Sequence, residues 1–425
     1  MKVINSNTTC LIILFLTFTY LQSELESSEI TRRGPDRGCE FYIDVSSSMR
    51  WYFTSKDDGT PASIQKFFQI KFDQIINEFK LGPVYLSAFG DVVPKPELVQ
   101  SNEGIGERFL FNFYQEQKRY FSGKGTDLVG VFENDEFGKH FMSIVITDNI
   151  HSVKGGNNMM LIKDALNALI NKGLHIYLIG MKSKFKGIID PLLTGQTTRI
   201  WYSGLRPVYI WIVSPSMIAG ELVTGQIMNS LREYMQVEFE NNENGLKKTE
   251  VERRVDSNLK YISLTNIKKM EINDDFIINN VSNSIDNYII TNMGDSIEVL
   301  LSRLIEDEAT IDIKKPIYND DLMRYWKVQL TIYPSVGWAD IIEEEDFWSL
   351  RIKCKKIRNN SILSLNILAV KDESKFWWKK WSTEDDSTIE NGGKTLGLNM
   401  ILKNAIDNLY SSPYKLKTFD IEITR

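Results

Sequence analysis

The sequence predicts an α/β domain with a doubly wound, mostly parallel sheet, followed by a β-rich, sandwich-like α+β domain. From residue 39 to residue 235, short and nearly continuous apolar runs alternate with amphipathic helical segments, as expected when helices cover both faces of a parallel sheet. After residue 245, apolar and polar residues alternate, which is typical of half-exposed antiparallel strands. We therefore expect one domain at 39–235 and a second at 245–425, joined by the acidic, Asn-rich stretch at 238–244.

Strands and amphipathic helices follow one another in the first predicted domain. In the first helix, Ile64, Phe68 and Phe72 recur on one face at the spacing of an α-helix. The apolar runs between the helices are short, as expected for strands that are buried on both faces. The predicted strands are Glu40–Val45, Val84–Phe89, Ser143–Thr147, Leu174–Ile179 and Val208–Val213, and the predicted helices are Ser63–Phe79, Leu161–Asn171 and Met217–Tyr234.

The second predicted domain is marked by period-2 patterns. In its first strand, Trp326, Val328 and Leu330 point to one face, and polar residues occupy the positions between them. The predicted strands are Trp326–Ile332, Trp348–Cys354, Leu363–Ile367 and Phe419–Ile423, and one helix is predicted at Leu396–Tyr410.

An aromatic cluster at Phe376–Trp381 is the most conspicuous feature of the second half. Contiguous aromatic residues on a surface bind sugars or protein partners, whereas the same residues at a strand edge pack into a core and leave their lysines in solvent. We favour core packing. The acidic run Glu343–Asp346 is interpreted as a solvated loop.

The N-terminus has the features of a secretory signal over residues 1–23. Lys2 precedes the apolar run Cys10–Leu21, and Ser23 supplies a small residue for cleavage. The apolar run is shorter than the roughly 20 residues that cross a bilayer. We expect an exported protein, secreted, periplasmic or at the cell surface, with a polar linker at 24–38. Membrane attachment is expected only if the N-terminal segment stays uncleaved.

Composition narrows the classes of partner and of site. The net charge of −6 and the lack of clustered Lys and Arg argue against nucleic acid as a partner. Only Cys39 and Cys354 would remain after cleavage, which is too few for a disulfide framework, and a single bridge between them stays open. The three histidines are spread along the chain without the spacing of zinc ligands.

Five oxygen-bearing side chains occur where strands or loops of the first domain end. Asp44, Ser46 and Ser48 follow the first strand, Thr126 follows a glycine-containing loop, and Asp148 ends the run 142–148. The carboxyl ends of parallel strands lie at one edge of a sheet, so these side chains are expected to converge. Two carboxylates and three hydroxyls suit a hard divalent cation such as Mg²⁺, which prefers oxygen ligands and keeps some of its waters.

Three motifs carry a resemblance to a known family. Asp-x-Ser-x-Ser at 44–48, Gly-x-Gly-Thr at 123–126 and Ile-Thr-Asp at 146–148 resemble the metal-ion-dependent adhesion site of von Willebrand factor type A (vWA) domains, and the resemblance covers residues 39–235. It implies a vWA or Rossmann-like fold. Asn149 departs from the pattern, since many members have glycine after the second aspartate.

The resemblance also implies roles for the five residues. Ser46, Ser48 and Thr126 would coordinate Mg²⁺ directly or through water, with Mn²⁺ or Ca²⁺ as alternatives. Asp44 and Asp148 would act through water-mediated or outer contacts. The open coordination position would accept an Asp or Glu side chain from a protein partner.

We therefore expect an exported, Mg²⁺-dependent protein-binding module for adhesion or assembly, and not an enzyme. One alternative is a structural component of a surface or envelope assembly in which the metal only stabilises the fold. A metal-assisted hydrolase is a weaker alternative, because no Gly-x-Ser-x-Gly, HExxH or phosphate-cradling glycine loop occurs, and Ser46 stands where a phosphoryl-transfer site would need a second aspartate. The partner-binding residues are not predicted.

Overall fold

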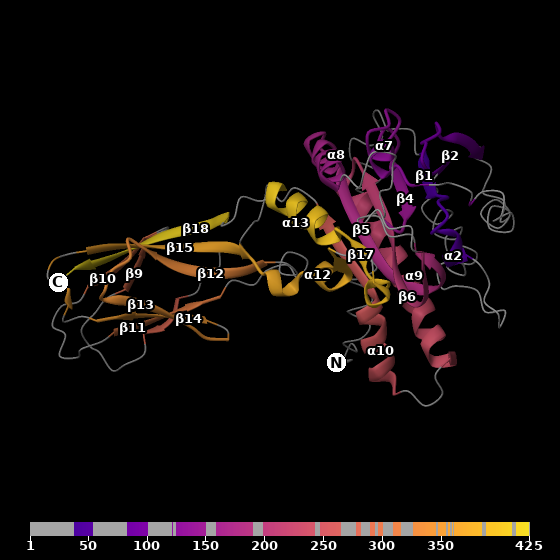
Figure 1. Cartoon of the computed structure of the whole chain (residues 1–425). Helices are drawn as coiled ribbons and strands as arrows, with labels where there is room; N and C mark the ends of the chain where they lie inside the picture. The colour runs from indigo at the N-terminus through magenta and orange to yellow at the C-terminus, as the bar shows by residue number, and fades with distance from the viewer. Residues whose placement is uncertain are drawn as a thin grey trace, which may run out of the picture. The chain divides into compact units, whose positions relative to one another are not determined.

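The computed structural model describes two compact units of the chain (Figure 1). The first unit comprises residues 1–265 and 378–405, and the second comprises residues 266–377 and 406–425. The predicted signal at 1–23, the linker up to residue 37, the predicted helix Ser63–Phe79 and Cys354 lie outside the described residues. The described residues are 38–53, 83–100, 121, 125–149, 159–189, 199–242, 247–264, 278–281, 290–293, 296–300, 309–315, 326–345, 347–353, 356–357, 359, 361–384, 388–409 and 414–424.

A mixed sheet of seven strands forms the centre of the first unit, which is therefore α/β. Its strands lie in the order β3-β2-β1-β4-β6-β5-β7. β1 pairs in parallel with both β2 and β4, whereas β2–β3, β4–β6, β5–β6 and β5–β7 are antiparallel pairs. The strands are β1 (Cys39–Asp44), β2 (Val84–Phe89), β3 (Glu97–Gln100), β4 (Met142–Thr147), β5 (His175–Ile189), β6 (Ile200–Ser214) and β7 (Leu259–Leu264).

The expectation of a mostly parallel sheet needs correction at β5 and β6. The strands predicted at Leu174–Ile179 and Val208–Val213 are parts of two longer strands, which pair antiparallel from His175–Ser214 to Ile189–Ile200. Parallel neighbours need a long crossover, usually a helix, whereas a short connection such as 190–199 suits an antiparallel pair. The alternation of buried and exposed residues in the second half of β5 is the period-2 pattern of that pair.

Helices of the first unit pack against the half of the sheet that contains β6, β5 and β7. α8 contacts β5, α9 contacts β5 and β6, and α10 contacts β5 and β7. All six residues of β1 and all six of β4 are buried, as expected for central strands. The helices of this region are α2 (Arg50–Phe53), α7 (Leu128–Phe132), α8 (Met159–Asn171), α9 (Met217–Asn242) and α10 (Lys248–Asn258).

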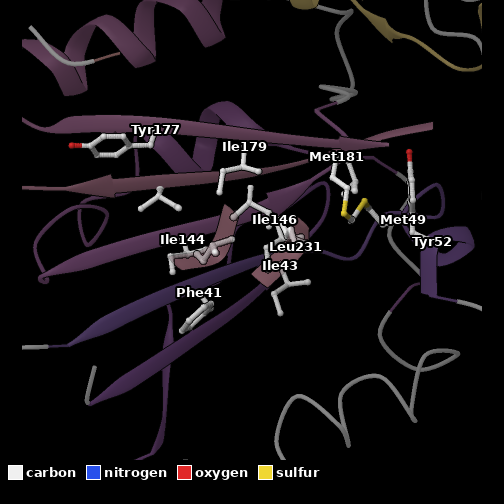
Figure 2. Packing of buried hydrophobic residues seen from close by; sticks show 14 of the residues in the cluster. Phe41, Ile43, Met49, Tyr52, Ile144, Ile146, Tyr177, Ile179, Met181 and Leu231 are labelled. Carbon is white, nitrogen blue, oxygen red and sulfur yellow. The ribbon is translucent and has the colours of Figure 1, made fainter. Parts of the chain in front are cut away.

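The core of the first unit includes side chains from β1, β4 and α9. Phe41 lies opposite Ile144 and Ile43 opposite Ile146 in the parallel register of β1 and β4. Figure 2 shows these four side chains close together, with Leu231 of α9 beside them. This core holds β1 and β4 side by side, and their carboxyl ends therefore lie at the same edge of the sheet.

The division of the chain differs from the expected boundary at 235–245. α9 continues to Asn242, and both α10 and β7 belong to the first unit, where β7 pairs with β5. α10 turns two valines inward, Val251 and Val255, which are 2 % and 0 % exposed. Residues up to Leu264 therefore complete the first core.

A segment far along the chain, residues 378–405, also belongs to the first unit. Tyr209 of β6 and Thr395 form a hydrogen bond between their hydroxyls at 2.9 Å. Trp378 and Trp381 are buried, which agrees with the core interpretation of the aromatic cluster, and the lysines between them are exposed. The segment contains α12 (Trp378–Trp381), β16 (Ser382–Thr383), η5 (Ile389–Asn391), β17 (Thr395–Leu396) and the beginning of α13 (Leu398–Leu409).

The second unit is rich in strands and has two sheets, in the orders β12-β15-β18-β10-β9 and β13-β14-β11-β8. One hydrophobic core takes Leu330 and Leu365 from the first sheet and Trp348 and Leu350 from the second. The elements are β8 (Ile278–Val281), β9 (Ile290–Met293), β10 (Ser296–Leu300), β11 (Ala309–Lys314), β12 (Trp326–Tyr333), β13 (Ala339–Glu343), β14 (Phe347–Ile352), β15 (Ser361–Lys371), η4 (Glu373–Lys375) and β18 (Tyr414–Thr424). Among the residues that the structure describes, no helix is both long and apolar enough to cross a membrane.

Candidate metal centre

Asp44 is the centre of the candidate site at the carboxyl end of β1. Its side chain is fully buried, and its Oδ1 accepts a 2.9 Å hydrogen bond from the backbone N–H of Ser46. This bond closes the turn that follows the strand. The Oγ atoms of Ser46 and Ser48 lie 3.1 Å apart in the same turn. The chain between Asp44 and Ser48 therefore gathers one carboxylate and two hydroxyls.

Thr126 joins this group from a distant loop. Its Oγ1 lies 3.3 Å from Oδ1 and 3.2 Å from Oδ2 of Asp44, to which it donates. The next residue fixes the loop in two ways: Asp127 N–H donates to Gly90 O at 2.6 Å, just beyond β2, and the Asp127 side chain accepts from Gly130 N–H at the start of α7. Thr126 is 1 % exposed, so its hydroxyl is directed into the protein.

The third contribution comes from the end of β4. Asp148 is 1 % exposed, and Thr147 Oγ1 donates a 2.8 Å hydrogen bond to Asp44 Oδ2. Burial and then the negative charge of Asp148 raise the pKa of Asp44 well above its ordinary value, and hydrogen bonds from Ser46 and Thr147 partly offset this rise. The structure thus brings together all five residues that the sequence predicts.

Sequence reasoning missed Thr147, Trp211 and the role of Asn149. Asn149 has a positive φ of 63°, and its N–H donates to Thr147 Oγ1 at 3.0 Å. Its side-chain Oδ1 accepts a 2.9 Å hydrogen bond from Trp211 Nε1 on β6. Thr147 could have been found from its position, because it precedes Asp148 and continues the register that sets Ile43 opposite Ile146. Nothing in the sequence indicates the Trp211 contact.

The donor set fits a hard divalent cation. The hydrogen-bond donors to Asp44 among the described residues are neutral, and none of the described Lys, Arg or His residues forms an ion pair with it. Burial and the nearby charge of Asp148 disfavour the ionised form of Asp44, and a bound cation would favour that form. In the described part of the chain, no three His, Cys, Asp or Glu side chains gather at one point, and hydroxyls and water would complete a coordination shell here.

Exposure at the centre is greatest along the serine turn. Ser48 is half-buried and Ser47 is exposed, whereas Ser46 is 4 % exposed. Just beyond the turn, Trp51 packs edge-on against Trp201, with ring centroids 6.0 Å apart, and Trp201 is 52 % exposed.

The amino end of β1 carries a second buried carboxylate with different neighbours. Glu40 Oε2 accepts a 2.7 Å hydrogen bond from Ser143 Oγ, which in turn accepts one from Gly138 N–H at 3.0 Å. His140 Nε2 lies 3.3 Å from Glu40 Oε1. Burial raises the pKa of Glu40 to about 7, although the hydrogen bond from Ser143 partly offsets the shift. The neighbouring Cys39 is buried and has no disulfide partner among the described residues.

No protein-family model matches this chain, and neither a curated protein nor a solved structure matches it. The chemistry of the site therefore has to follow from its own residues and their contacts.

Proposed function

We propose that the first unit is a vWA-type module that binds Mg²⁺ and, through it, an acidic side chain of a protein partner. Ser46, Ser48 and Thr126 would hold the ion directly or through water, and Asp44 and Asp148 would supply its charge balance. Mn²⁺ or Ca²⁺ would suit the same oxygen donors. The protein would be exported and act in adhesion or assembly at a cell surface, in the periplasm or in the medium.

One observation carries this proposal: Thr126 Oγ1 contacts both oxygens of Asp44, although the two residues are 82 positions apart. A hydroxyl from a distant loop, two hydroxyls from the serine turn and a second carboxylate from β4 surround one buried acid. The doubly wound arrangement is supported by the shared direction of β1, β2 and β4 and by α8, which connects β4 to β5. The antiparallel β6 is a departure from the mostly parallel sheet that the resemblance implies.

The chemistry of binding would depend on a vacant coordination position. Neutral hydroxyl ligands leave the ion more electrophilic than carboxylate ligands would, and a carboxylate from a partner is then an effective additional ligand. The partner would approach over Ser48, the half-buried member of the set.

Isothermal titration with Mg²⁺ tests the proposal on matched variants. We expect wild-type protein to bind one Mg²⁺ and the Thr126→Ala variant to lose at least about tenfold in affinity, as expected when a ligand or its immediate support is removed. Ser47→Ala is the control, because Ser47 lies in the same turn, is exposed and is outside the proposed ligand set. Equal Mg²⁺ affinity in wild type and Thr126→Ala would contradict the proposed site.

A second candidate function is favoured by the depth of the site. Asp44, Ser46, Thr126 and Asp148 are at most 4 % exposed, which suits an ion that only stabilises a component of a surface assembly. In that case a chelator lowers the melting temperature but leaves capture of partners from a native extract unchanged. Loss of capture on chelation, at a temperature where the protein stays folded, would favour the adhesion module.

A further inference from the structure

Asn149 is held in an uncommon conformation by two specific contacts. Its φ of 63° lies in the left-handed region, which most residues other than glycine avoid. The backbone N–H is bound by Thr147 Oγ1, and the side-chain Oδ1 is bound by Trp211 Nε1. Because an indole N–H can only donate, this contact identifies the atom facing Trp211 as the oxygen of the amide. The orientation of the Asn149 side chain is therefore determined.

The other atom of that amide, Nδ2, is buried and has no hydrogen-bond partner within the described residues. Asn149 as a whole is 2 % exposed. Buried amide N–H groups are nearly always satisfied, and one that lacks a protein partner calls for a water, an ion's hydration shell or a ligand. Since Oδ1 is directed at Trp211, Nδ2 projects from the same carbon in a different direction.

The location of this donor suggests what it binds. Asn149 directly follows Asp148, and its backbone is linked through Thr147 to Asp44. An N–H group cannot coordinate a cation, but it can donate to an oxygen that does. A carboxylate that binds a metal through one oxygen has a second oxygen free to accept such a bond.

We propose that Asn149 Nδ2 donates to the carboxylate of the partner's Asp or Glu side chain when that carboxylate binds the cation, and that Trp211 is the residue that positions it. The inference rests on the proposed function. This contact makes Asn149 a specificity-determining residue. A neutral amide ligand would present to Nδ2 either its oxygen, which is a weaker acceptor than a carboxylate oxygen, or its N–H groups, which cannot accept a hydrogen bond. A carboxylate is accepted and an amide is disfavoured.

A small-molecule probe tests the inference on the full chain. Mn²⁺ replaces Mg²⁺, propionate stands in for a glutamate side chain, and propionamide is its neutral counterpart. Displacement of Mn²⁺-bound water by the probe is followed through water-proton relaxation, at an Mn²⁺ concentration that saturates each variant. Asn149→Gly is the informative variant, because glycine adopts a positive φ freely while the amide is removed.

We expect Asn149→Gly to raise the Kd for propionate about tenfold, as for a lost hydrogen bond to a charged group, and to lose the preference over propionamide. Ser47→Ala is expected to match wild type. Equal propionate affinity in Asn149→Gly and wild type, or equal affinity of wild type for both probes, would overturn the inference while Mn²⁺ still binds. Failure of wild type to bind Mn²⁺ at all would instead overturn the proposed function, and this inference with it.

The positioning role of Trp211 has a separate spectroscopic readout. In ¹⁵N-labelled protein, the Trp211 indole signal is identified by its absence in Trp211→Phe. We expect Mn²⁺-free protein loaded with Mg²⁺ and propionate to shift this signal in wild type, because a charged acceptor polarises the Asn149 amide. Asn149→Gly removes the amide between the carboxylate and Trp211, so Mg²⁺ and propionate should leave the Trp211 indole signal unshifted in this variant. A shift of equal size in both proteins would show that Trp211 does not act through Asn149.

Discussion

The two ends of β1 each carry a buried carboxylate, but the two acids have different neighbours. At the amino end, Glu40 has the Ser143 hydroxyl at 2.7 Å and the His140 imidazole at 3.3 Å. At the carboxyl end, Asp44 receives hydrogen bonds from neutral groups within the described part of the chain, and the negative charge of Asp148 acts on it. Burial raises the pKa of both acids.

The difference indicates which end needs a cation from outside the chain. Glu40 has two partners within the protein, the Ser143 hydroxyl and the His140 imidazole, although its Oε1 makes no hydrogen bond. Asp44 is buried beside a second acid, and none of the described Lys, Arg or His residues forms an ion pair with Asp44, so a bound cation would favour its ionised form. We therefore assign a structural role to the Glu40 end and the candidate metal site to the Asp44 end.

The largest expected effect concerns the pH dependence at the Glu40 end. A carboxyl group with its pKa raised from the usual 4.5 to about 7 binds more protons in the folded state between these values, so stability falls as pH rises through this window. The loss at pH 8 relative to pH 4 is roughly 3 kcal/mol. Glu40→Gln keeps the acceptor for Ser143 and removes this dependence. Urea unfolding of wild type and Glu40→Gln between pH 4 and pH 8 gives the difference in their free energies of unfolding at each pH. A difference that does not change with pH would refute the assignment.

The second prediction concerns the Asp44 end and the response to metal. At an Mg²⁺ concentration of 100 times its Kd, binding should stabilise wild-type protein by about 2.7 kcal/mol. Asp148→Asn should abolish this gain, because it removes one of the two buried charges. Glu40→Gln should retain it, since Glu40 lies at the other end of the strand. Thermal unfolding with Mg²⁺ and with a chelator measures both. An equal Mg²⁺ response in Asp148→Asn and wild type would remove the contrast between the ends.

The parts of the site that could be predicted are those that depend on local patterns and strand direction. The strand at Val84–Phe89 lies where the apolar run predicts it, β1 is shifted by one residue, and β4 begins one residue earlier than predicted. Both strands run in the same direction, so the carboxyl ends that carry Asp44 and Asp148 lie at one edge of the sheet. Strand direction alone is enough to predict this. Thr126 is predicted from the resemblance of Gly-x-Gly-Thr at 123–126 to the family motif, because strand direction alone does not place its loop.

The parts that could not be predicted depend on long-range packing. The second half of β5 alternates lysines with buried residues, and this pattern specifies a strand but not its neighbour. Residues 378–405 pack in the first unit through contacts such as the Tyr209–Thr395 hydrogen bond, which joins positions 186 residues apart. A local sequence pattern does not indicate such a contact. The Trp211–Asn149 hydrogen bond is also long-range, because a side chain of β6 holds the side chain of a residue just beyond β4.

A matched pair of hydroxyl deletions should have intermediate effects on the two ends. Thr147→Val removes the donor to Asp44 and the acceptor for Asn149 N–H, and Ser143→Ala removes the donor to Glu40 and the acceptor for Gly138 N–H. Each should cost about 1–2 kcal/mol, as for buried hydrogen bonds that lose one partner. Only Thr147→Val should also weaken the Mg²⁺ response. Urea unfolding with and without Mg²⁺ tests this, and a weakened response in Ser143→Ala would show that the two ends are coupled.

The smallest effect is expected for the imidazole that distinguishes the Glu40 end. His140→Phe keeps an aromatic ring to stack on Tyr85, whose centroid lies 4.6 Å from that of His140, and removes the nitrogen that faces Glu40. Because His140 is partly exposed, the loss of stability should be at most about 1 kcal/mol and should shrink at high salt. Urea unfolding at pH 6 in low and high salt measures it. A loss that is unchanged by salt would mean that His140 acts through packing against Gly38, and the contrast in charge would then rest on Asp148 alone.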